Sequence, residues 1–243
     1  MKKTVLLMVI GIMALTSCSF NVSGVGIITA SDNIVEKEYQ LDKFNEVVTH
    51  VIANVELIQS DTKDGLVVLS APDNYIDLFR FESKSERLDI SFVKDNINIE
   101  PKNVMITVYT SDLLKVRNSG AAAIMLDSLD TDQLEVANSG IGSFKLRRVI
   151  ADKINVKCTG VGDISIEGET LDADLSCSGV GNINAEGLKS NNVKASVTGV
   201  GSISCYASEY IEGRVTGVGG LRYAGHPKNK DLNKPFTGSI SEI

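Results

Sequence analysis

A glycine-containing phrase that occurs six times is the first candidate for chemistry in the chain. Each copy has Ser or Thr, then Gly and a small apolar residue, and five of the six copies then have a second Gly. Neighbouring glycines can cradle a phosphate, but no copy reaches the third Gly of the dinucleotide fingerprint and none is followed by Lys-Ser or Lys-Thr. A structural role at a chain corner is therefore favoured for these glycines: Gly120, Gly140, Gly142, Gly160, Gly162, Gly179, Gly181, Gly199, Gly201, Gly217 and Gly219.

Carboxylates are the second candidate, because polysaccharide cleavage on a β-solenoid needs a carboxylate pair, or a base with Ca²⁺ ligands, on one outer face. At matching positions of neighbouring repeats, Asp163 and Asp174 face Ser, Asn or Lys instead of another carboxylate. We therefore expect no carboxylate cluster across repeats, and solvated turns for the candidate residues Asp127, Asp130, Asp132, Asp163, Asp172 and Asp174.

Histidine and cysteine give no further catalytic pattern. His50 and His226 lie in different halves of the chain, so no place for a Ser-His-Asp arrangement is expected. No Cys-x-x-Cys or Cys/His spacing indicates a metal. We expect a protein that is not an enzyme, with no catalytic residue, cofactor or metal.

The spacing of the repeats indicates the elements that position these residues. The leading glycines are 20, 20, 19, 20 and 18 residues apart, a period typical of stacked repeats. Apolar and polar residues alternate with period two on both sides of each Gly, which predicts half-buried strands. Units this short leave no room for a helical crossover, so like positions stack in parallel, about 4.8 Å apart, as in a β-solenoid.

One inward column changes its residue type in adjacent pairs, as in-register stacking favours. It reads Asn118, Asn138, Cys158, Cys177, Val197, Val215. A hydrogen bond between the two asparagines is expected. A parallel in-register pair rarely meets disulfide geometry, so Cys158 and Cys177 are expected to be buried free thiols, as is Cys205.

The N-terminal residues have the pattern of a targeting signal. Lys2 and Lys3 precede an apolar run that ends at Leu15-Thr16-Ser17-Cys18. This order is similar to the lipobox of bacterial lipoproteins and predicts a signal peptide over 1–17, cleavage before Cys18, and lipid on that cysteine. Three acyl chains would anchor the protein durably to a bilayer, with the outer membrane as the expected location, periplasmic or surface-exposed.

The mature chain is acidic. Removing residues 1–17 takes two of the 24 basic residues and none of the 31 acidic ones, leaving a net charge of −9. This charge argues against nucleic acid as a partner. Residues 18–35 are expected to be a tether with a possible first strand, and 36–243 one solenoid domain, with regular coils over 112–225 and a cap over 226–243. Irregular strands are expected before the coils, with a short helix only within 74–85.

Together these features resemble a known family. They are the lipobox, Glu38–Phe44 leading into alternating strands, the repeated Ser/Thr-Gly-Val-Gly-x-Ile, Gly181–Asn184, and the closing stretch Leu221–Pro227. The chain is similar to the GIN-domain family, described as a "putative auto-transporter adhesin head domain". The resemblance covers roughly residues 22 to 240. It implies a right-handed parallel β-helix on secreted or lipid-anchored envelope proteins, and it brings no catalytic residues.

The leading functional hypothesis is a non-enzymatic, lipid-anchored adhesin whose solenoid face binds a glycan or a protein. The alternatives are a structural or signalling envelope component with an endogenous protein partner and, third, a polysaccharide lyase or hydrolase. Carbohydrate binding lacks its usual sign, since the chain has no Trp and 5% aromatic residues. Oligomeric state is not indicated. Two positions are expected to be structurally critical: Val161 in the core, and Gly179 at positive φ.

Overall fold

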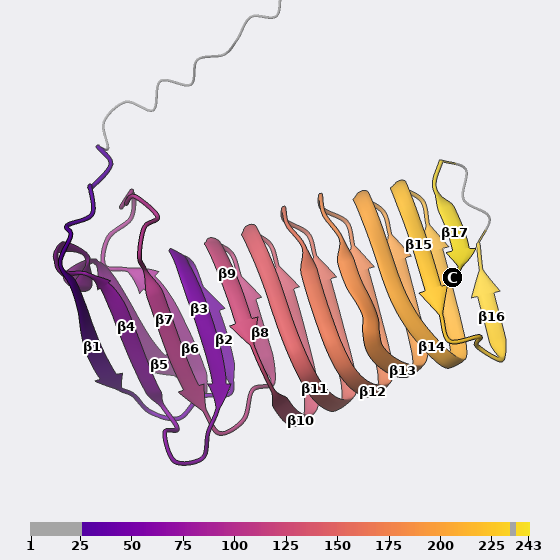
Figure 1. The fold of residues 1–243 in the computed structure, drawn as a ribbon, viewed down its shortest axis with the longest axis horizontal. Coiled ribbons are helices and arrows are strands. Elements are labelled where there is room, and N and C mark those ends of the chain that lie inside the picture. Colours follow the sequence, from indigo (N-terminus) through magenta and orange to yellow (C-terminus); the bar gives the residue numbers. More distant parts are fainter. Residues whose placement is uncertain (1–25, 234–236) are drawn as a thin grey trace, which may run out of the picture.

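The computed structural model describes residues 26–233 and 237–243 (Figure 1). Cys18 and the signal peptide expected over 1–17 lie outside the described residues. Within the described part, strands form one 17-stranded sheet that winds into a solenoid. No helix in this part is long and apolar enough to cross a membrane.

The strands run along nearly the whole described chain. Their bounds are β1 Ile34–Gln40, β2 Glu46–Thr49, β3 Ile52–Gln59, β4 Leu66–Pro72, β5 Phe79–Lys84, β6 Arg87–Phe92, β7 Met105–Thr110, β8 Lys115–Asn118, β9 Ala121–Leu126, β10 Leu129–Asn138, β11 Ile141–Cys158, β12 Ile164–Cys177, β13 Ile183–Val197, β14 Val200–Val215, β15 Val218–Ala224, β16 Asn229–Leu232 and β17 Ser239–Glu242. The helix expected within 74–85 is a 3₁₀ helix, η1, at Asp73–Leu78, and the rest of that segment is β5.

The long strands stack in parallel and in register, which confirms the β-solenoid. β10 to β14 pair each with the next, and each coil makes one sharp corner and one bend. The corners form the glycine edge, along the top of Figure 1, at residues 139–143, 159–163, 178–182, 198–202 and 216–220. The bends form the opposite, bend edge, along the bottom of Figure 1, at residues 127–132, 147–152, 167–171, 187–191 and 206–210.

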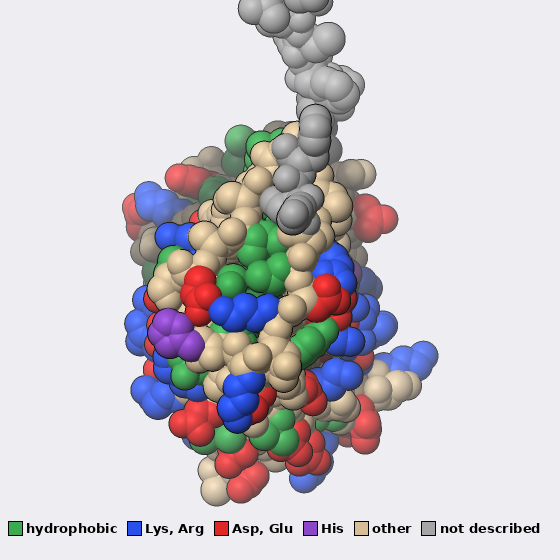
Figure 2. All heavy atoms as spheres, turned by 90° about the vertical axis from the view of Figure 1, so that its right-hand side faces the viewer, with side chains coloured by type: hydrophobic (Ala, Val, Ile, Leu, Met, Phe, Trp, Pro, Cys, Tyr) green, Lys and Arg blue, Asp and Glu red, His purple; other side chains and the backbone are tan. Residues whose placement is uncertain are grey.

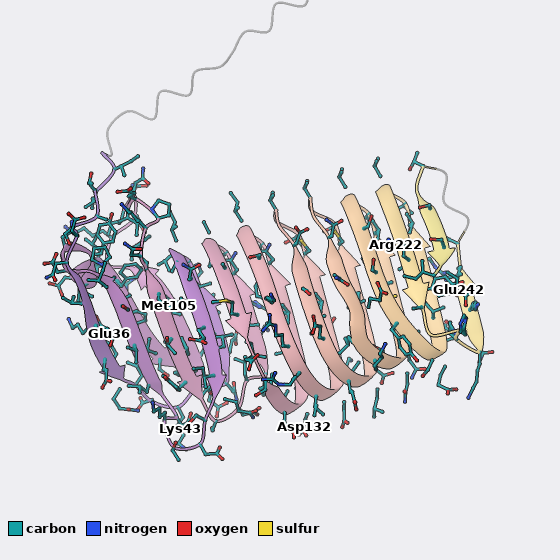
Figure 3. All side chains as sticks on the ribbon, viewed as in Figure 1. Glu36, Lys43, Met105, Asp132, Arg222 and Glu242 are labelled. Atoms are coloured by element: carbon teal, nitrogen blue, oxygen red, sulfur yellow. The ribbon has the colours of Figure 1, made fainter. Side chains whose placement is uncertain are left out.

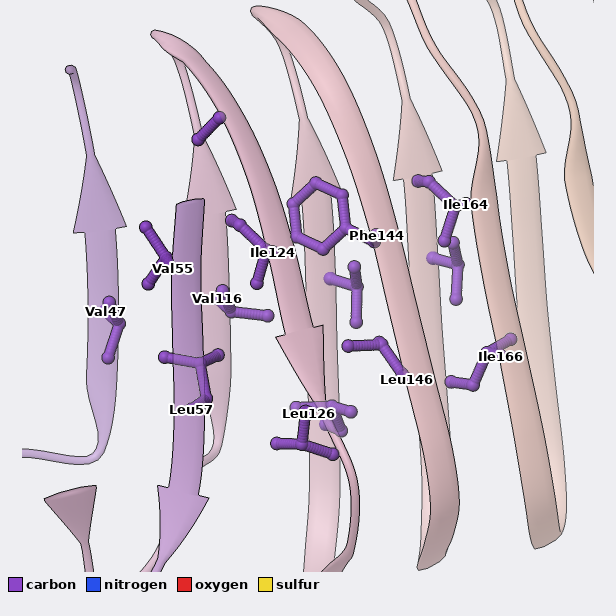
Figure 4. Close-up of a cluster of buried hydrophobic side chains, with 14 of the residues drawn as sticks. Val47, Val55, Leu57, Val116, Ile124, Leu126, Phe144, Leu146, Ile164 and Ile166 are labelled. Carbon is purple, nitrogen blue, oxygen red and sulfur yellow. The ribbon is translucent and has the colours of Figure 1, made fainter. Parts of the chain in front are cut away.

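The core lies between the two walls that join these edges. Aliphatic and aromatic side chains stack in columns along it, and Figure 4 shows Val55, Ile124, Phe144 and Ile164 in one such column. All four are buried. Burying one side chain of this kind contributes about 1.5–3 kcal/mol, so the alternation that predicted strands also supplies their main stabilisation.

The paired inward column is confirmed. Asn118 aligns with Asn138 and donates its Nδ2 to the Oδ1 of that residue at 3.0 Å. Cys158 aligns with Cys177, and both are buried and free. A hydrogen bond between the two thiols, together with burial, raises the pKa of Cys158, and burial raises the pKa of Cys205 to about 12. Neither Cys158 nor Cys205 is therefore a ready nucleophile. The same hydrogen bond lowers the pKa of Cys177 to about 7, but this thiol is fully buried and out of reach of a substrate.

Two expectations about the corners were wrong. Val161 is 49% exposed instead of buried, because the tight corner turns its side chain away from the core. Positive φ belongs to the second glycine of each corner, as in Gly162 at 133°, and not to leading glycines such as Gly179. A Cβ on Gly179 would instead fall on the carbonyl oxygen of Gly160. The leading glycine is thus required by close backbone contact.

The N-terminal half departs from this regularity, as expected. β4 runs antiparallel to β1 and β7, and β5 runs antiparallel to β6. Aromatic rings fill this part of the structure: the ring centroids of Tyr39 and Phe81 are 4.7 Å apart, and those of Phe79 and Phe92 are 5.1 Å apart. β2 and β3 nevertheless pair in parallel with β8 and β9. The regular stack therefore begins on a parallel template made by the irregular half.

At the C-terminal end, β16 and β17 add a partial coil onto β14 and β15. Figure 2 looks onto this end and shows hydrophobic side chains surrounded by charged ones. Glu242 accepts hydrogen bonds from Lys230 Nζ at 2.6 Å and from His226 Nδ1 at 2.9 Å, and Lys230 lies 5.3 Å from the centre of the Tyr223 ring. These charged groups keep the last coil solvated, which is how an open sheet edge avoids pairing with another chain.

Candidate binding surfaces

A ridge of apolar side chains follows the glycine edge. Its members are the residues between the two glycines of each corner, and their exposed fractions lie between 49% and 64%: Ile141, Val161, Val180, Val200 and Val218. They are aligned from coil to coil. Figure 3 shows side chains that project from this edge coil after coil. The ridge is an exposed apolar row with a glycine on each side of every member.

The corner glycines cannot hold a phosphate, because their N–H groups are already used. Gly160, Val161 and Gly162 donate to carbonyl oxygens of adjacent coils at 2.9, 2.9 and 3.0 Å. A phosphate-binding loop needs such groups free and convergent. The structural role expected for the glycines agrees with this geometry.

A groove continues the ridge toward the N-terminal half. It has a volume of about 460 Å³, and its lining includes the run Ala121–Ala123, which begins β9. Pro101 and Val104 also line it, together with the ridge residues Ile141 and Val161. The lining is mostly apolar, so the groove and the ridge form one apolar surface on the glycine edge.

The bend edge carries a hollow of different chemistry. Its volume is about 420 Å³, and Asp130, Asp132, Asp152 and Glu169 line it together with two large apolar residues. The expectation that no carboxylate cluster forms across coils was wrong, because the bend brings together residues outside the columns that were compared. No group of three or more side chains suited to a metal occurs in the described residues.

The two large apolar residues of this hollow are unusual for an exposed surface. Ile150 is 53% exposed and Leu171 is 51% exposed. Lys189, from the next coil, completes the lining. Large aliphatic groups beside carboxylates and one amine form a surface that can pack on an apolar group and attract a cation at the same time.

The other candidate aspartates are engaged on the surface. Asp127 pairs with Arg148, Asp163 Oδ1 accepts from Asn182 Nδ2 at 2.9 Å, and Asp172 Oδ1 accepts from Asn192 Nδ2 at 2.9 Å. Asp174 aligns with Lys194. The first three aspartates connect neighbouring coils, whereas Asp174 lines a small hollow with Asp172 and two lysines. The four do not converge on one site.

A Ser-His-Asp arrangement does occur, contrary to expectation. Ser119 Oγ lies 2.5 Å from His50 Nδ1, and His50 Nε2 lies 3.3 Å from Asp89 Oδ2. The two halves of the chain meet here because β2 pairs with both β6 and β8.

This arrangement lacks the second component of acyl-transfer catalysis. An oxyanion hole needs free N–H groups beside the nucleophile, but the N–H groups of Ser119 and Gly120 both donate to Thr49 O, at 2.9 and 3.3 Å. The N–H of Ala121 donates to Val51 O at 3.0 Å. The geometry therefore supports a surface hydrogen-bond chain between coils.

The comparisons with known proteins agree with the architecture. The family described as "Putative auto-transporter adhesin, head GIN domain" matches residues 43–227. No curated protein matches the chain. The crystal structure of a "putative adhesin" from Bacteroides fragilis is 32% identical, with a TM-score of 0.85, and the match covers 89% of this chain and 100% of that one.

Two further crystal structures share the fold at lower identity. A "putative lipid binding protein" from Parabacteroides distasonis is 20% identical, with a TM-score of 0.67 and coverage of 90% of this chain and 100% of that one. A "putative adhesin" from Parabacteroides merdae is 17% identical, with a TM-score of 0.61 and coverage of 89% and 98%. With its glycine corners, parallel coils and matched length, the chain belongs to the family of GIN-domain adhesin heads.

Proposed function

We propose that the protein is an adhesin of the bacterial cell envelope, anchored by lipid on Cys18, that binds its partner through the hollow on the bend edge and catalyses no reaction. Membership of the adhesin-head family supports a role in the envelope or on the surface. The observation that carries the proposal is the half exposure of Ile150 and Leu171 inside a hollow on a rigid solenoid. Solenoids bind partners over such extended faces.

The chemistry of the hollow favours a protein partner over a glycan. None of the residues that line it is aromatic, so it offers no ring on which a sugar would stack. Its carboxylates and aliphatic groups suit a segment that presents Lys or Arg beside apolar side chains.

Display on intact cells tests this proposal. Protease added to intact cells should cleave the domain, and the Cys18→Ser protein should be released from the membrane fraction. The lipid itself is detected as added mass on the N-terminal peptide by mass spectrometry. Protection in intact cells, with cleavage only after the outer membrane is ruptured, would contradict the adhesin and favour a structural or signalling component with an endogenous partner.

Polysaccharide cleavage is the second candidate, because the hollow gathers four carboxylates. All four are exposed, whereas a general acid needs burial to keep its proton at neutral pH. Release of reducing or unsaturated sugar ends from a polysaccharide panel, abolished by Asp132→Asn together with Asp152→Asn, would establish this function. Equal release by the wild type and this variant would exclude the hollow as a catalytic site.

A further inference from the structure

We propose that the glycine edge lies on the bilayer that anchors the protein, with the ridge side chains at the boundary between lipid headgroups and acyl chains. The proposal rests on the proposed lipid at Cys18. It gives a role to the apolar surface that the adhesin function leaves unused, and it fixes how the bend edge is presented.

The chemistry of the edge suits a lipid surface. Glycine flanks every ridge residue on both sides, so no larger side chain shields it. Asp163 is the one charged residue within the corners at 139–143, 159–163, 178–182, 198–202 and 216–220. The mature chain is acidic elsewhere, and carboxylates are repelled by anionic lipid. The glycine edge is therefore the long surface that approaches a bilayer with the least electrostatic and desolvation cost.

The anchor holds this same edge close to the membrane. The described chain begins at Gly26 and leaves the solenoid on the side of the glycine edge (Figure 1). Eight residue steps separate Cys18 from Gly26, and even fully extended they reach at most about 29 Å. A short tether keeps the ridge at a high effective concentration beside the lipid, so weak contacts suffice to orient the domain.

The shape of the ridge favours lipid over a second copy of the chain. The row is one residue wide, and its five members span about 19 Å at the strand spacing. A stable protein interface buries about 1,200–2,000 Å² in total, which a single row of Val and Ile side chains does not provide. Shallow insertion of apolar side chains into a lipid interface requires no matching shape.

This orientation has a consequence for adhesion. The bend edge is opposite the glycine edge (Figure 1), so docking of the ridge directs the hollow with Ile150 and Leu171 away from the anchoring membrane. An adhesin head held in this way presents its binding surface outward.

Tryptophan reporters test the proposal directly, because the chain has no Trp. Val180→Trp places a reporter on the ridge, and Leu171→Trp is the matched control, since the two native side chains are 52% and 51% exposed. The full-length lipidated proteins are reconstituted into phosphatidylcholine vesicles whose acyl chains carry bromine, which quenches Trp at short range. We expect quenching of the ridge reporter at least about threefold stronger than that of the control.

The outcomes separate the orientation from the anchor. Equal quenching of the two reporters, or stronger quenching of Leu171→Trp, overturns the proposal while leaving the anchor intact. An N-terminal peptide without the mass of a lipid refutes the anchor, and the proposed docking then falls with it. Val200→Trp is a second ridge reporter, and the strand signal in circular dichroism checks that each variant folds.

Discussion

The glycine edge and the bend edge of the same coils differ in how much sequence change and register change they tolerate. At the glycine edge, the backbones approach so closely that a Cβ on a leading glycine would fall on a carbonyl oxygen of the coil below. The register shifts between coils instead fall on the bend edge, as between Leu146 and Val149 or Ser165 and Gly168. At the glycine edge this backbone contact recurs at every corner and the chemistry repeats, whereas at the bend edge it occurs at Gly168 but not at Gly187. The bend edge tolerates irregularity and changes its chemistry from coil to coil.

Glycine substitutions should give the largest difference in stability between the two edges. Gly179→Val places a side chain against the backbone of Thr159, whose carbonyl carbon would lie 2.7 Å from the new Cβ. We expect a loss of more than about 4 kcal/mol in the free energy of unfolding, measured by denaturant titration. At the bend edge, Gly187→Ala meets the side chain of Glu167, which can move aside, and should cost less than about 1 kcal/mol. Similar losses for the two variants would refute the distinction between the edges.

Two apolar residues of one coil provide the next test. Ile164 is fully buried, whereas Val161, three residues earlier, is half-exposed on the ridge. Ile164→Ala should cost about 2–5 kcal/mol in unfolding free energy. Val161→Asp should cost less than about 1 kcal/mol, because its charge stays in water. A large loss of stability for Val161→Asp would show that this column of residues faces the core, as the sequence pattern alone indicated.

The asparagine pair tests the inward column at intermediate cost. Asn138→Ala removes one of the two hydrogen bonds that the buried Nδ2 of Asn118 donates, the bond to Asn138 Oδ1 at 3.0 Å, and leaves the bond to Ile141 O at 3.1 Å. It should cost about 1–3 kcal/mol. Replacing both residues with Val, as in the last two coils, should cost less than the sum of the single changes. Strict additivity in this double-mutant cycle, read from thermal unfolding, would show that the two amides do not depend on each other.

The smallest effect concerns acid stability at the C-terminal end. The hydrogen bonds from Lys230 and His226 lower the pKa of Glu242 from 4.5 to about 2. The folded-state pKa is depressed, so the stabilisation is complete above pH 4.5 and is lost as the pH falls toward 2. Glu242→Gln should flatten the dependence of Tm on pH across this window. Glu186→Gln, which removes another exposed carboxylate, is the control, and identical pH profiles for the two variants would contradict the assignment.

The sequence repeat predicted the coils well because apolar residues that recur at the repeat spacing are enough to identify the inward-facing positions. The 8- and 2-residue offsets of Val116, Ile124 and Leu126 recur at Val47, Val55 and Leu57, which pair with them in register. Residues 47–57 therefore form an additional coil that lacks the glycine corner. Recognising this coil in the sequence would have placed His50 beside Ser119. The spacing did not show which way a corner residue points, since a Val between two glycines fits either side of a tight turn. It also did not show the carboxylates at the bend, because the inward columns and the columns of Asp163 and Asp174 do not include them, although Asp132 and Asp152 are one 20-residue period apart on strands that pair in register.

The most direct test compares adhesion by two matched double variants. Cells display either Ile150→Ser with Leu171→Ser on the bend edge or Val161→Ser with Val180→Ser on the ridge, at equal surface levels, and bind to an array of matrix proteins and glycans. We predict that the bend variant loses binding by at least about tenfold, because it removes the apolar centre of the interface, while the ridge variant stays within about twofold of the wild type. Loss of binding by the ridge variant, with full binding by the bend variant, would contradict the assignment of function to the bend edge.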